Sequence, residues 1–174
     1  MTIAIQRFGA EEIQTHQAEL VELLRDAVDG GSSVNFIAPM DLGLAAASWE
    51  KWAGEVSAGQ RIVLAALDGE RVVGCVHLVL AGQPNGLHRA DVQKVLVHSH
   101  ARRQGIATQL MQAIEEEARA AKRSLLVLDT ERGSGAEKLY ERIGYARLGA
   151  IPQFALNFDG SQLITTVLFY KLLE

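Results

Sequence analysis

The segment from Val95 to Thr108 constrains the fold of this chain more than any other. An apolar run passes into a short polar loop with a basic pair, Arg102 and Arg103, and Gly105 then precedes a long amphipathic pattern. The next apolar run begins at Ser124. When a helix connects two neighbouring strands of a sheet, the strands run parallel and the connection is a right-handed crossover. The sequence therefore predicts a β-α-β unit whose helix starts beside two guanidinium groups.

The rest of the chain alternates between apolar runs of strand length and patterns of helical spacing. We expect strands over residues 3–8, 61–67, 72–80, 90–97, 124–129, 145–158 and 163–173. We expect helices over residues 11–29, from the cap Asp41 onward, over 106–121 and over 135–143. This order predicts an α/β fold with a mixed sheet and helices on both of its faces. A length of 174 residues is expected to form one domain, 1–174.

Composition and charge narrow the classes of partner. The net charge is −4, from 17 Lys and Arg against 21 Asp and Glu, so the chain lacks the basic footprint of a nucleic-acid binder. No apolar run approaches the ~18 residues of a membrane span, and no leader precedes the first strand, so we expect no membrane partner and a cytoplasmic location. Cys75 is the single cysteine and is expected to be a buried thiol. The histidines show no metal-ligand spacing, and we expect no metal.

The start of the helix at Gly105 is a candidate anion site. Backbone N–H groups at a helix N-terminus have no partner within the helix and carry a partial positive charge, which suits a phosphate or pyrophosphate. The small residues Gly105 and Ala107 allow a close approach of the anion to the backbone. An ordinary helix start with solvated arginines is the alternative interpretation.

Two motifs in the right order resemble the GCN5-related N-acetyltransferase (GNAT) family. The first is Arg102-x-x-Gly105-x-Ala107, and the second is Ala136-x-x-x-Tyr140-x-x-x-Gly144-Tyr145. The second departs from the family pattern, because Gly133 stands where the family has Asn, and Ser134 is expected to substitute for it. Further segments resemble a subgroup, the tabtoxin-resistance acetyltransferases. They are residues 29–34, 83–87, 89–94, 128–131 and the region near Pro152.

This resemblance implies the GNAT fold, a mostly antiparallel sheet with one splayed parallel pair of strands, and acetyl-CoA as co-substrate. It implies that the cofactor lies between strands 90–97 and 124–129, with the backbone of Val95 and Val97 pairing with the pantetheine and the N–H near Leu96 polarising the thioester. The expected cofactor-binding residues are Val95, Leu96, Val97, Arg102, Arg103, Gln104, Gly105, Ile106, Ala107, Thr108, Ser134, Glu137 and Tyr140. The resemblance also implies that Tyr140 protonates the departing thiolate.

Acetyl transfer also needs a base, because an amine with a pKa near ~10 is mostly protonated at neutral pH. Asp129 ends an apolar strand, where partial burial would raise its pKa; the alternative is a cap or turn residue. Asp91 is expected on the same strand face as Val95, ~13 Å away at ~3.3 Å per residue, so a water would bridge the gap. An exposed charge near the strand start is the alternative for Asp91.

The polar, glycine-rich segment Gly30–Met40 is expected to close over the acceptor pocket. Our first interpretation is direct acetyl transfer to a small-molecule amine or hydroxyl, as in detoxification of a toxin or an antibiotic-like β-lactam. Acetylation of a protein or peptide and a non-catalytic CoA-binding module are the alternatives. The resemblance and the exposed closing strands also make a homodimer plausible.

Overall fold

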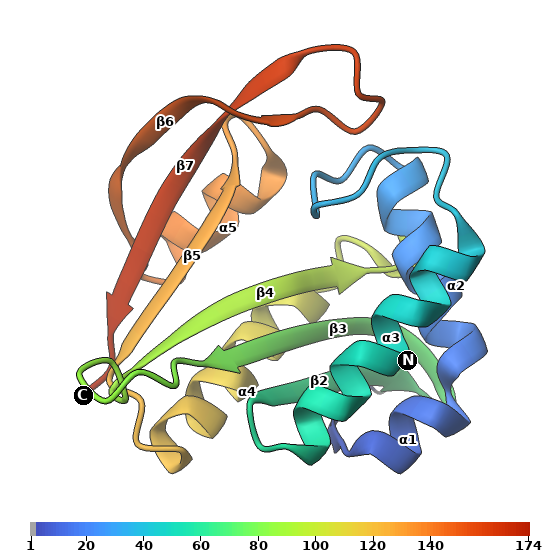
Figure 1. Cartoon of the computed structure of the whole chain (residues 1–174), viewed down its shortest axis with the longest axis horizontal. Helices are drawn as coiled ribbons and strands as arrows, with labels where there is room; N and C mark the ends of the chain where they lie inside the picture. Colours follow the sequence, from blue (N-terminus) through green and yellow to red (C-terminus); the bar gives the residue numbers. More distant parts are fainter. Residues whose placement is uncertain (1–2) are drawn as a thin grey trace.

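The computed structural model describes residues 3–174 and contains a seven-stranded mixed sheet in the order β1-β2-β3-β4-β5-β7-β6 (Figure 1). Only β4 and β5 pair in parallel, and every other neighbouring pair is antiparallel. The strands are β1 (Ile3–Phe8), β2 (Arg61–Asp68), β3 (Arg71–Leu80), β4 (Arg89–Val97), β5 (Leu125–Glu131), β6 (Ala146–Leu156) and β7 (Leu163–Leu172). The predicted mixed α/β sheet is therefore confirmed.

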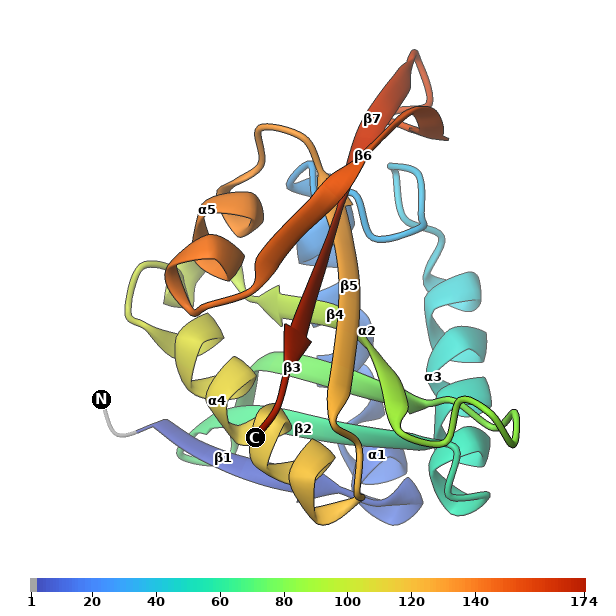
Figure 2. The same ribbon diagram turned by 90° about the vertical axis from the view of Figure 1, so that its left-hand side faces the viewer.

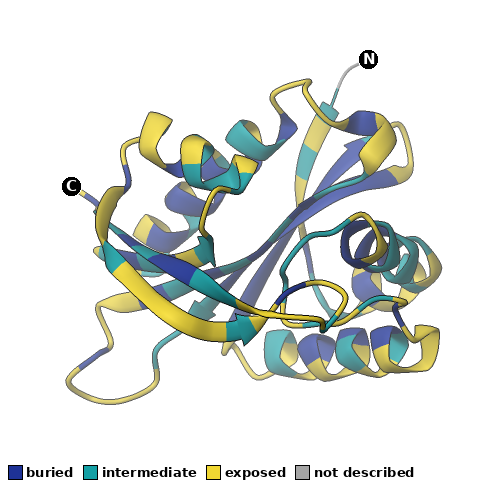
Figure 3. Ribbon diagram, turned by 90° about the horizontal axis from the view of Figure 1, so that it is seen from above, coloured by how far each residue is buried: buried dark blue, intermediate teal, exposed yellow. Residues whose placement is uncertain are grey.

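Helices cover both faces of this sheet (Figure 2). They are α1 (Ala10–Thr15), α2 (Gln17–Asp29), α3 (Leu42–Ser57), α4 (Ile106–Ala120) and α5 (Gly135–Arg142), with the short 3₁₀ turn η1 (Ser99–Ala101). One core cluster packs α1, α2 and α3 around the fully buried Trp49, and the other packs α4 and α5 around Met111 and Phe169. Figure 3 shows that the central strands are largely buried, whereas the helices carry both buried and exposed residues. Within residues 3–174, we find no helix of the length and apolar character that a membrane crossing requires.

The predicted helix 11–29 is wrong in one respect, because it forms two helices that meet at His16. His16 has φ −97° and ψ 15°, outside α-helical geometry. Its ring stacks on Phe8 with 5.1 Å between ring centroids, and its Nδ1 lies 3.0 Å from Glu19 Oε1. These contacts hold the chain in a turn that the continuous apolar spacing of the sequence does not reveal.

The parallel pairing of β4 and β5 is short. It spans Arg89–Asp91 opposite Leu125–Val127, and beyond these residues the two strands diverge (Figure 1). From Val92 onward, the edge of β4 that faces β5 has no strand partner, which leaves backbone groups free to bind another extended chain. This opening corresponds to the splayed pair that the sequence predicts.

A bulge in β4 lies beside this opening. The register on β3 moves from His77 opposite Gln93 to Cys75 opposite Leu96, so β4 carries one extra residue, and Lys94 adopts a left-handed φ of 52°. An extra residue reverses the alternation of side chains beyond it.

The expected common face of Asp91 and Val95 is therefore wrong. Before the bulge, Ala90 and Val92 pack in the cluster of α4, and Asp91 points to the opposite face by alternation. After the bulge, Val95 packs against the cluster of α4. The side chains of Asp91 and Val95 consequently lie on opposite faces of the sheet.

Cys75 is fully buried on β3, and its thiol contacts the carbonyl oxygen of Lys94 at 3.5 Å. Burial raises the pKa of this thiol to about 12, while the Lys94 ammonium opposes the shift. The expected burial of this thiol is confirmed.

Candidate active site

Two adjoining cavities open beside the divergent strands. One, of about 340 Å³, surrounds the start of α4. The other, of about 570 Å³, lies between the α2–α3 loop (residues 30–41) and the end of β5. Their shared wall consists of Ser32, Val95, Arg102, Gly135, Ala136 and Tyr140. The arrangement can bring one molecule from each cavity into contact.

The smaller cavity contains the phosphate loop, which we define as residues 98–105. Gly105 caps α4 with a left-handed φ of 79°, and Arg103 has a φ of 63°. A Cβ built on Gly105 would meet no atom within 4 Å, so the space above this backbone is open. The first hydrogen bond of α4 runs from Gln109 N to Gly105 O at 3.1 Å. The backbone N–H groups at the start of α4, before Gln109, therefore have no partner within the helix. These donors and the helix dipole can hold a doubly charged phosphate group.

Most predicted cofactor residues line this smaller cavity. They are Val95, Leu96, Val97, Arg102, Arg103, Gly105, Ile106, Ala107, Thr108 and Tyr140. Ser134 lines the larger cavity instead and caps α5, accepting from Glu137 N at 3.3 Å. Gln104 and Glu137 line neither cavity, and the Glu137 carboxylate accepts from Gly133 N and from Arg147 Nη1, each at 2.6 Å. The cofactor roles of these residues stay predictions.

Tyr140 lies on α5 where the two cavities meet. Its ring packs against Phe169 and Tyr145, with centroid distances of 5.9 and 6.0 Å. Burial and the Asp129 carboxylate raise the pKa of the Tyr140 phenol above its usual range. The phenol therefore keeps its proton at neutral pH and can donate it to a developing anion.

Asp129 and Asp91 lie near each other on the two diverging strands. Asp129 lines the larger cavity, and its Oδ2 accepts a hydrogen bond from Thr166 Oγ1 at 3.0 Å. Its side chain is exposed, so the expected partial burial is wrong, because β5 leaves the core cluster after Leu128. Asp91 is half-buried outside both cavity walls; burial raises its pKa, Arg89 opposes the shift, and Asp129 adds to it.

The α2–α3 loop forms one side of the larger cavity through residues 30–35. It is fixed by Met40 N, which donates to Asp29 Oδ1 at 2.8 Å, and by Ala38 N, which donates to Phe158 O at 2.7 Å. The expected position of this segment beside the second pocket is therefore confirmed. Its role in choosing an acceptor stays a prediction.

Lys94 is a residue of this site that the sequence analysis did not place. The bulge turns its side chain toward the α2–α3 loop, where Nζ donates to Val34 O at 2.9 Å and lies 5.5 Å from the centre of the Phe36 ring. Burial and the neighbouring Arg61 lower the pKa of Lys94 to about 8. A single lysine in the alternating run of β4, directly before the apolar residues Val95–Val97, was the available signal.

The residues 3–174 contain no group of three or more His, Cys, Asp or Glu side chains arranged to hold a metal ion. Four groups with acid–base chemistry lie at or beside the opening between β4 and β5: Tyr140, Asp129, Asp91 and Lys94.

Solved structures share this architecture across nearly the whole chain. An N-acetyltransferase from Staphylococcus aureus Mu50 is 18% identical, with a TM-score of 0.82 and full coverage of both chains. A ribosomal-protein-alanine N-acetyltransferase from Brucella melitensis is 23% identical, with a TM-score of 0.77 and coverage of 98% and 99%. A putative acetyltransferase from Salmonella typhimurium, solved with its cofactor acetyl-CoA, is 16% identical, with a TM-score of 0.79 and coverage of 100% and 95%.

The family model described as an acetyltransferase (GNAT) domain matches residues 58–147, slightly more than half of the chain. This range contains β4, the phosphate loop, α4, β5 and α5, which supply most of the walls of both cavities. The chain belongs to the GNAT family of acetyltransferases.

Proposed function

We propose that this protein transfers an acetyl group from acetyl-CoA directly to an amine or hydroxyl of a small molecule. The observation that carries this proposal is the pair of cavities that meet at Tyr140, one with a phosphate loop and the other bounded by the α2–α3 loop. The Salmonella typhimurium relative contains acetyl-CoA, which supports the same co-substrate here.

The donor is held mainly by the backbone. The N–H groups at the start of α4 bind the pyrophosphate, with Arg102 and Arg103 adding positive charge. The free edge of β4 at Val95 and Val97 pairs with the pantetheine as an added strand would. When bound, acetyl-CoA supplies an acetyl group activated as a thioester.

Two proton transfers complete the reaction. A carboxylate, Asp129 or Asp91 through water, takes the proton from the acceptor, whose nitrogen or oxygen forms the new bond to the acetyl carbon. The bond between that carbon and sulfur breaks, and the Tyr140 phenol protonates the departing sulfur. The N–H near Leu96 stabilises negative charge on the carbonyl oxygen during this exchange.

The larger cavity favours a polar metabolite of modest size. Its walls include Lys94, Arg132, Asp129 and Glu131, so both signs of charge are present. The α2–α3 loop is fixed over this cavity rather than forming an open groove for a peptide. The resemblance to tabtoxin-resistance acetyltransferases suggests a toxin or an antibiotic-like β-lactam as the acceptor. The Brucella melitensis relative is a ribosomal-protein-alanine N-acetyltransferase, which keeps a peptide acceptor as the second candidate.

The donor site is tested by isothermal titration with CoA. We expect the double variant Arg102→Glu/Gly105→Glu to lose CoA binding while it remains folded by circular dichroism. The charge-reversal control Lys122→Glu, in the exposed turn that follows α4, should bind CoA as the wild type does. Retained affinity in the double variant would refute the assignment of the phosphate loop.

Catalysis is tested by a panel of small amines and alcohols and of peptide N-termini, with release of CoA thiol as the readout. Turnover confined to small molecules supports the proposal, and turnover confined to peptides favours the alternative. Tight CoA binding without turnover on either class would indicate a non-catalytic CoA-binding module.

The base is assigned by comparing the pH dependence of kcat/KM in Asp129→Asn and Asp91→Asn. Because burial raises the pKa of Asp91, a reaction that uses Asp91 should lose rate as the pH falls through a value above the usual aspartate range. That limb should disappear in the variant that lacks the base. An unchanged profile in both variants would exclude both carboxylates.

We also propose that the protein forms a homodimer through β6. This edge strand exposes Leu148, Ile151 and Phe154, with 68%, 40% and 51% of their surfaces accessible, and an exposed apolar edge favours association. Light scattering after gel filtration should report twice the chain mass, and Leu148→Lys should shift it toward the monomer. A monomeric wild type at micromolar concentration would contradict this proposal.

A further inference from the structure

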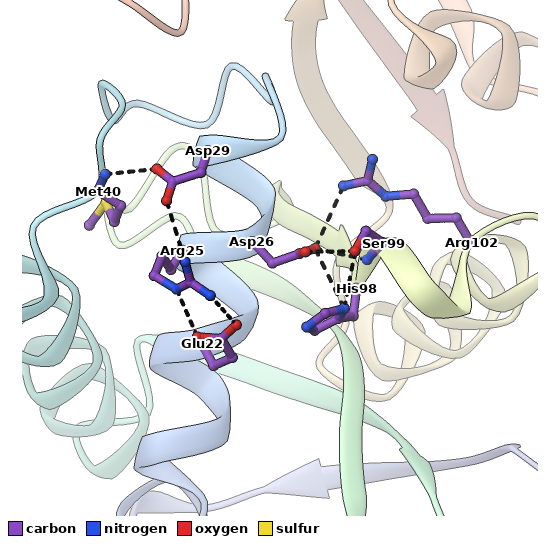
Figure 4. A network of polar contacts seen from close by, with 8 residues as sticks. All are labelled: Glu22, Arg25, Asp26, Asp29, Met40, His98, Ser99 and Arg102. Atoms are coloured by element: carbon purple, nitrogen blue, oxygen red, sulfur yellow. Dashed lines mark hydrogen bonds and ion pairs between the residues drawn. The ribbon is translucent and has the colours of Figure 1, made fainter.

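The last turn of α2 carries two acidic residues where the helix dipole disfavours them. Asp26 and Asp29 lie near the C-terminal end, and that turn contains no basic residue. Both carboxylates accept hydrogen bonds from outside α2, and Asp29 Oδ2 also lies 3.7 Å from Arg25 Nη1 within the helix (Figure 4). Asp29 Oδ1 accepts from Met40 N at the far end of the α2–α3 loop, at 2.8 Å. An unfavourable interaction with the helix dipole that is offset by specific tertiary contacts is typical of functional sites.

Asp26 makes the corresponding contact with the phosphate loop. Its Oδ2 accepts from Ser99 N at 2.8 Å and its Oδ1 from Ser99 Oγ at 2.7 Å. His98 Nδ1 lies 3.7 Å and Arg102 Nη2 3.9 Å from Oδ2 (Figure 4). The Asp26 side chain is only 15% exposed, so these contacts are partly shielded from water.

These contacts keep Asp26 ionised. Burial opposes ionisation, but the two hydrogen bonds from Ser99 and the nearby His98 and Arg102 together hold the pKa of Asp26 below its usual value. A carboxylate that accepts two hydrogen bonds from one residue fixes that residue in both position and orientation. Ser99 is therefore held against α2.

Ser99 stands at the entrance of the phosphate loop, and Arg102 follows three residues later. Arg102 Nε donates to Val97 O at 3.1 Å, and its side chain lines both cavities. The loop itself contains left-handed residues at Arg103 and Gly105, and such a backbone needs external support to hold one geometry. Asp26 supplies that support from a helix that otherwise packs in the other core cluster.

We propose that Asp26 is a positioning residue that preorganises the phosphate loop for the pyrophosphate of acetyl-CoA. This inference rests on the proposed function. The same turn of α2 thus anchors the loops of both cavities, Asp26 on the donor side and Asp29 on the acceptor side. Asp26 touches neither substrate in this role and acts through Ser99 and Arg102.

The test compares a whole donor with a truncated one. Acetyl-CoA carries the pyrophosphate, whereas S-acetylpantetheine carries the same thioester and pantetheine arm without it. Asp26→Ala should weaken binding of acetyl-CoA about tenfold, equivalent to about 1.4 kcal/mol, and leave the affinity for S-acetylpantetheine unchanged. General damage to the fold would weaken both donors alike, so equal losses would overturn the proposal.

Graded variants separate position from charge. Asp26→Asn keeps an oxygen for Ser99 N and an N–H group for Ser99 Oγ, so it should bind acetyl-CoA within about twofold of the wild type. Ser99→Ala removes one of the two hydrogen bonds and should fall between the wild type and Asp26→Ala. The control Glu22→Ala, one turn earlier on α2 and paired with Arg25, should leave both affinities unchanged.

Two failures are distinguishable. If the wild type binds no acetyl-CoA, the proposed function itself is wrong. If the wild type binds it and Asp26→Ala binds equally well, only the role of Asp26 is refuted. Should Asp26→Ala fail to fold, the Ser99→Ala and Asp26→Asn affinities decide, and a wild-type affinity in Ser99→Ala would then refute the proposal.

Discussion

Replacing Lys94 by methionine should change how the stability of the protein depends on pH. Lys94 is 9% exposed and lies in the β4 bulge, with Arg61, Cys75, His77 and Asp129 as its charged or titratable neighbours. Burial and Arg61 lower its pKa from 10.5 to about 8. Methionine keeps the length of the side chain and its contacts with the Phe36 and Trp52 rings while removing the titrating group.

The sign and size follow from proton linkage. Between the folded pKa near 8 and the unfolded value of 10.5, the unfolded chain binds more protons, so the contribution of Lys94 to the free energy of unfolding, which is unfavourable while the buried side chain is charged, increases as the pH rises. Between about pH 7 and about pH 9, this contribution grows by about 1.3 kcal/mol at 1.36 kcal/mol per pKa unit. The buried Cys75 thiol, with a pKa of about 12, does not titrate in the folded state in this range, and its titration in the unfolded chain is common to both proteins.

Urea unfolding at several pH values measures the effect as a difference between two proteins. Other groups titrate in both chains and cancel, so the free energy of unfolding of the wild type should rise by that amount relative to Lys94→Met. The control Lys138→Met, at an exposed position on α5, should show a constant difference. If the difference in the free energy of unfolding between the wild type and Lys94→Met stays constant, or falls with rising pH, the lowered pKa of a buried Lys94 ammonium is refuted.

Three further predictions follow from buried groups. Tyr140→Phe should lower kcat about 10²-fold, the lower range for a lost general acid, with little change in the CoA dissociation constant; equal kcat values would exclude the phenol as the acid. Trp49→Phe removes an indole N–H that donates to a carbonyl of α2 at 2.9 Å in a fully buried position, and should lower the free energy of unfolding in urea by about 2 kcal/mol. Gly74→Ala would place a Cβ 2.8 Å from a carbonyl oxygen of β4 and should destabilise the protein by about 2 kcal/mol. In contrast, the Cβ of Gly54→Ala in α3 meets no atom within 4 Å, and this variant should be more stable than the wild type by up to about 1 kcal/mol. Urea unfolding that ranks the two variants in the reverse order would contradict this packing.

Local patterns predicted the order of elements and the phosphate loop because each depends on residues close in sequence. The helix start at Gly105 and the crossover to β5 are examples, since spacing and a glycine determine them. The break at His16 was missed because a tertiary contact with Phe8 overrides continuous helical spacing.

The site was predicted less completely than the fold. The β4 bulge has no signature in the alternating run around Lys94, and it reversed the inferred face of Asp91 relative to Val95. The hydrogen bond from Ser99 Oγ to Asp26 Oδ1 joins residues 73 positions apart in the sequence, so the two residues meet only in the folded chain. Acidic residues at the end of α2 were the one local sign of that contact.

The isolation of Cys75 has a practical consequence for every assay of this protein. Its sulfur is buried on β3, and burial raises the pKa of the thiol to about 12, whereas free CoA has an accessible thiol. A chromogenic disulfide reagent is therefore expected to react with the released CoA and not with the folded enzyme, since the reaction requires an exposed thiolate. The same reagent reports the fraction of molecules that have unfolded, because the chain contains one cysteine and it reacts only when the sheet opens.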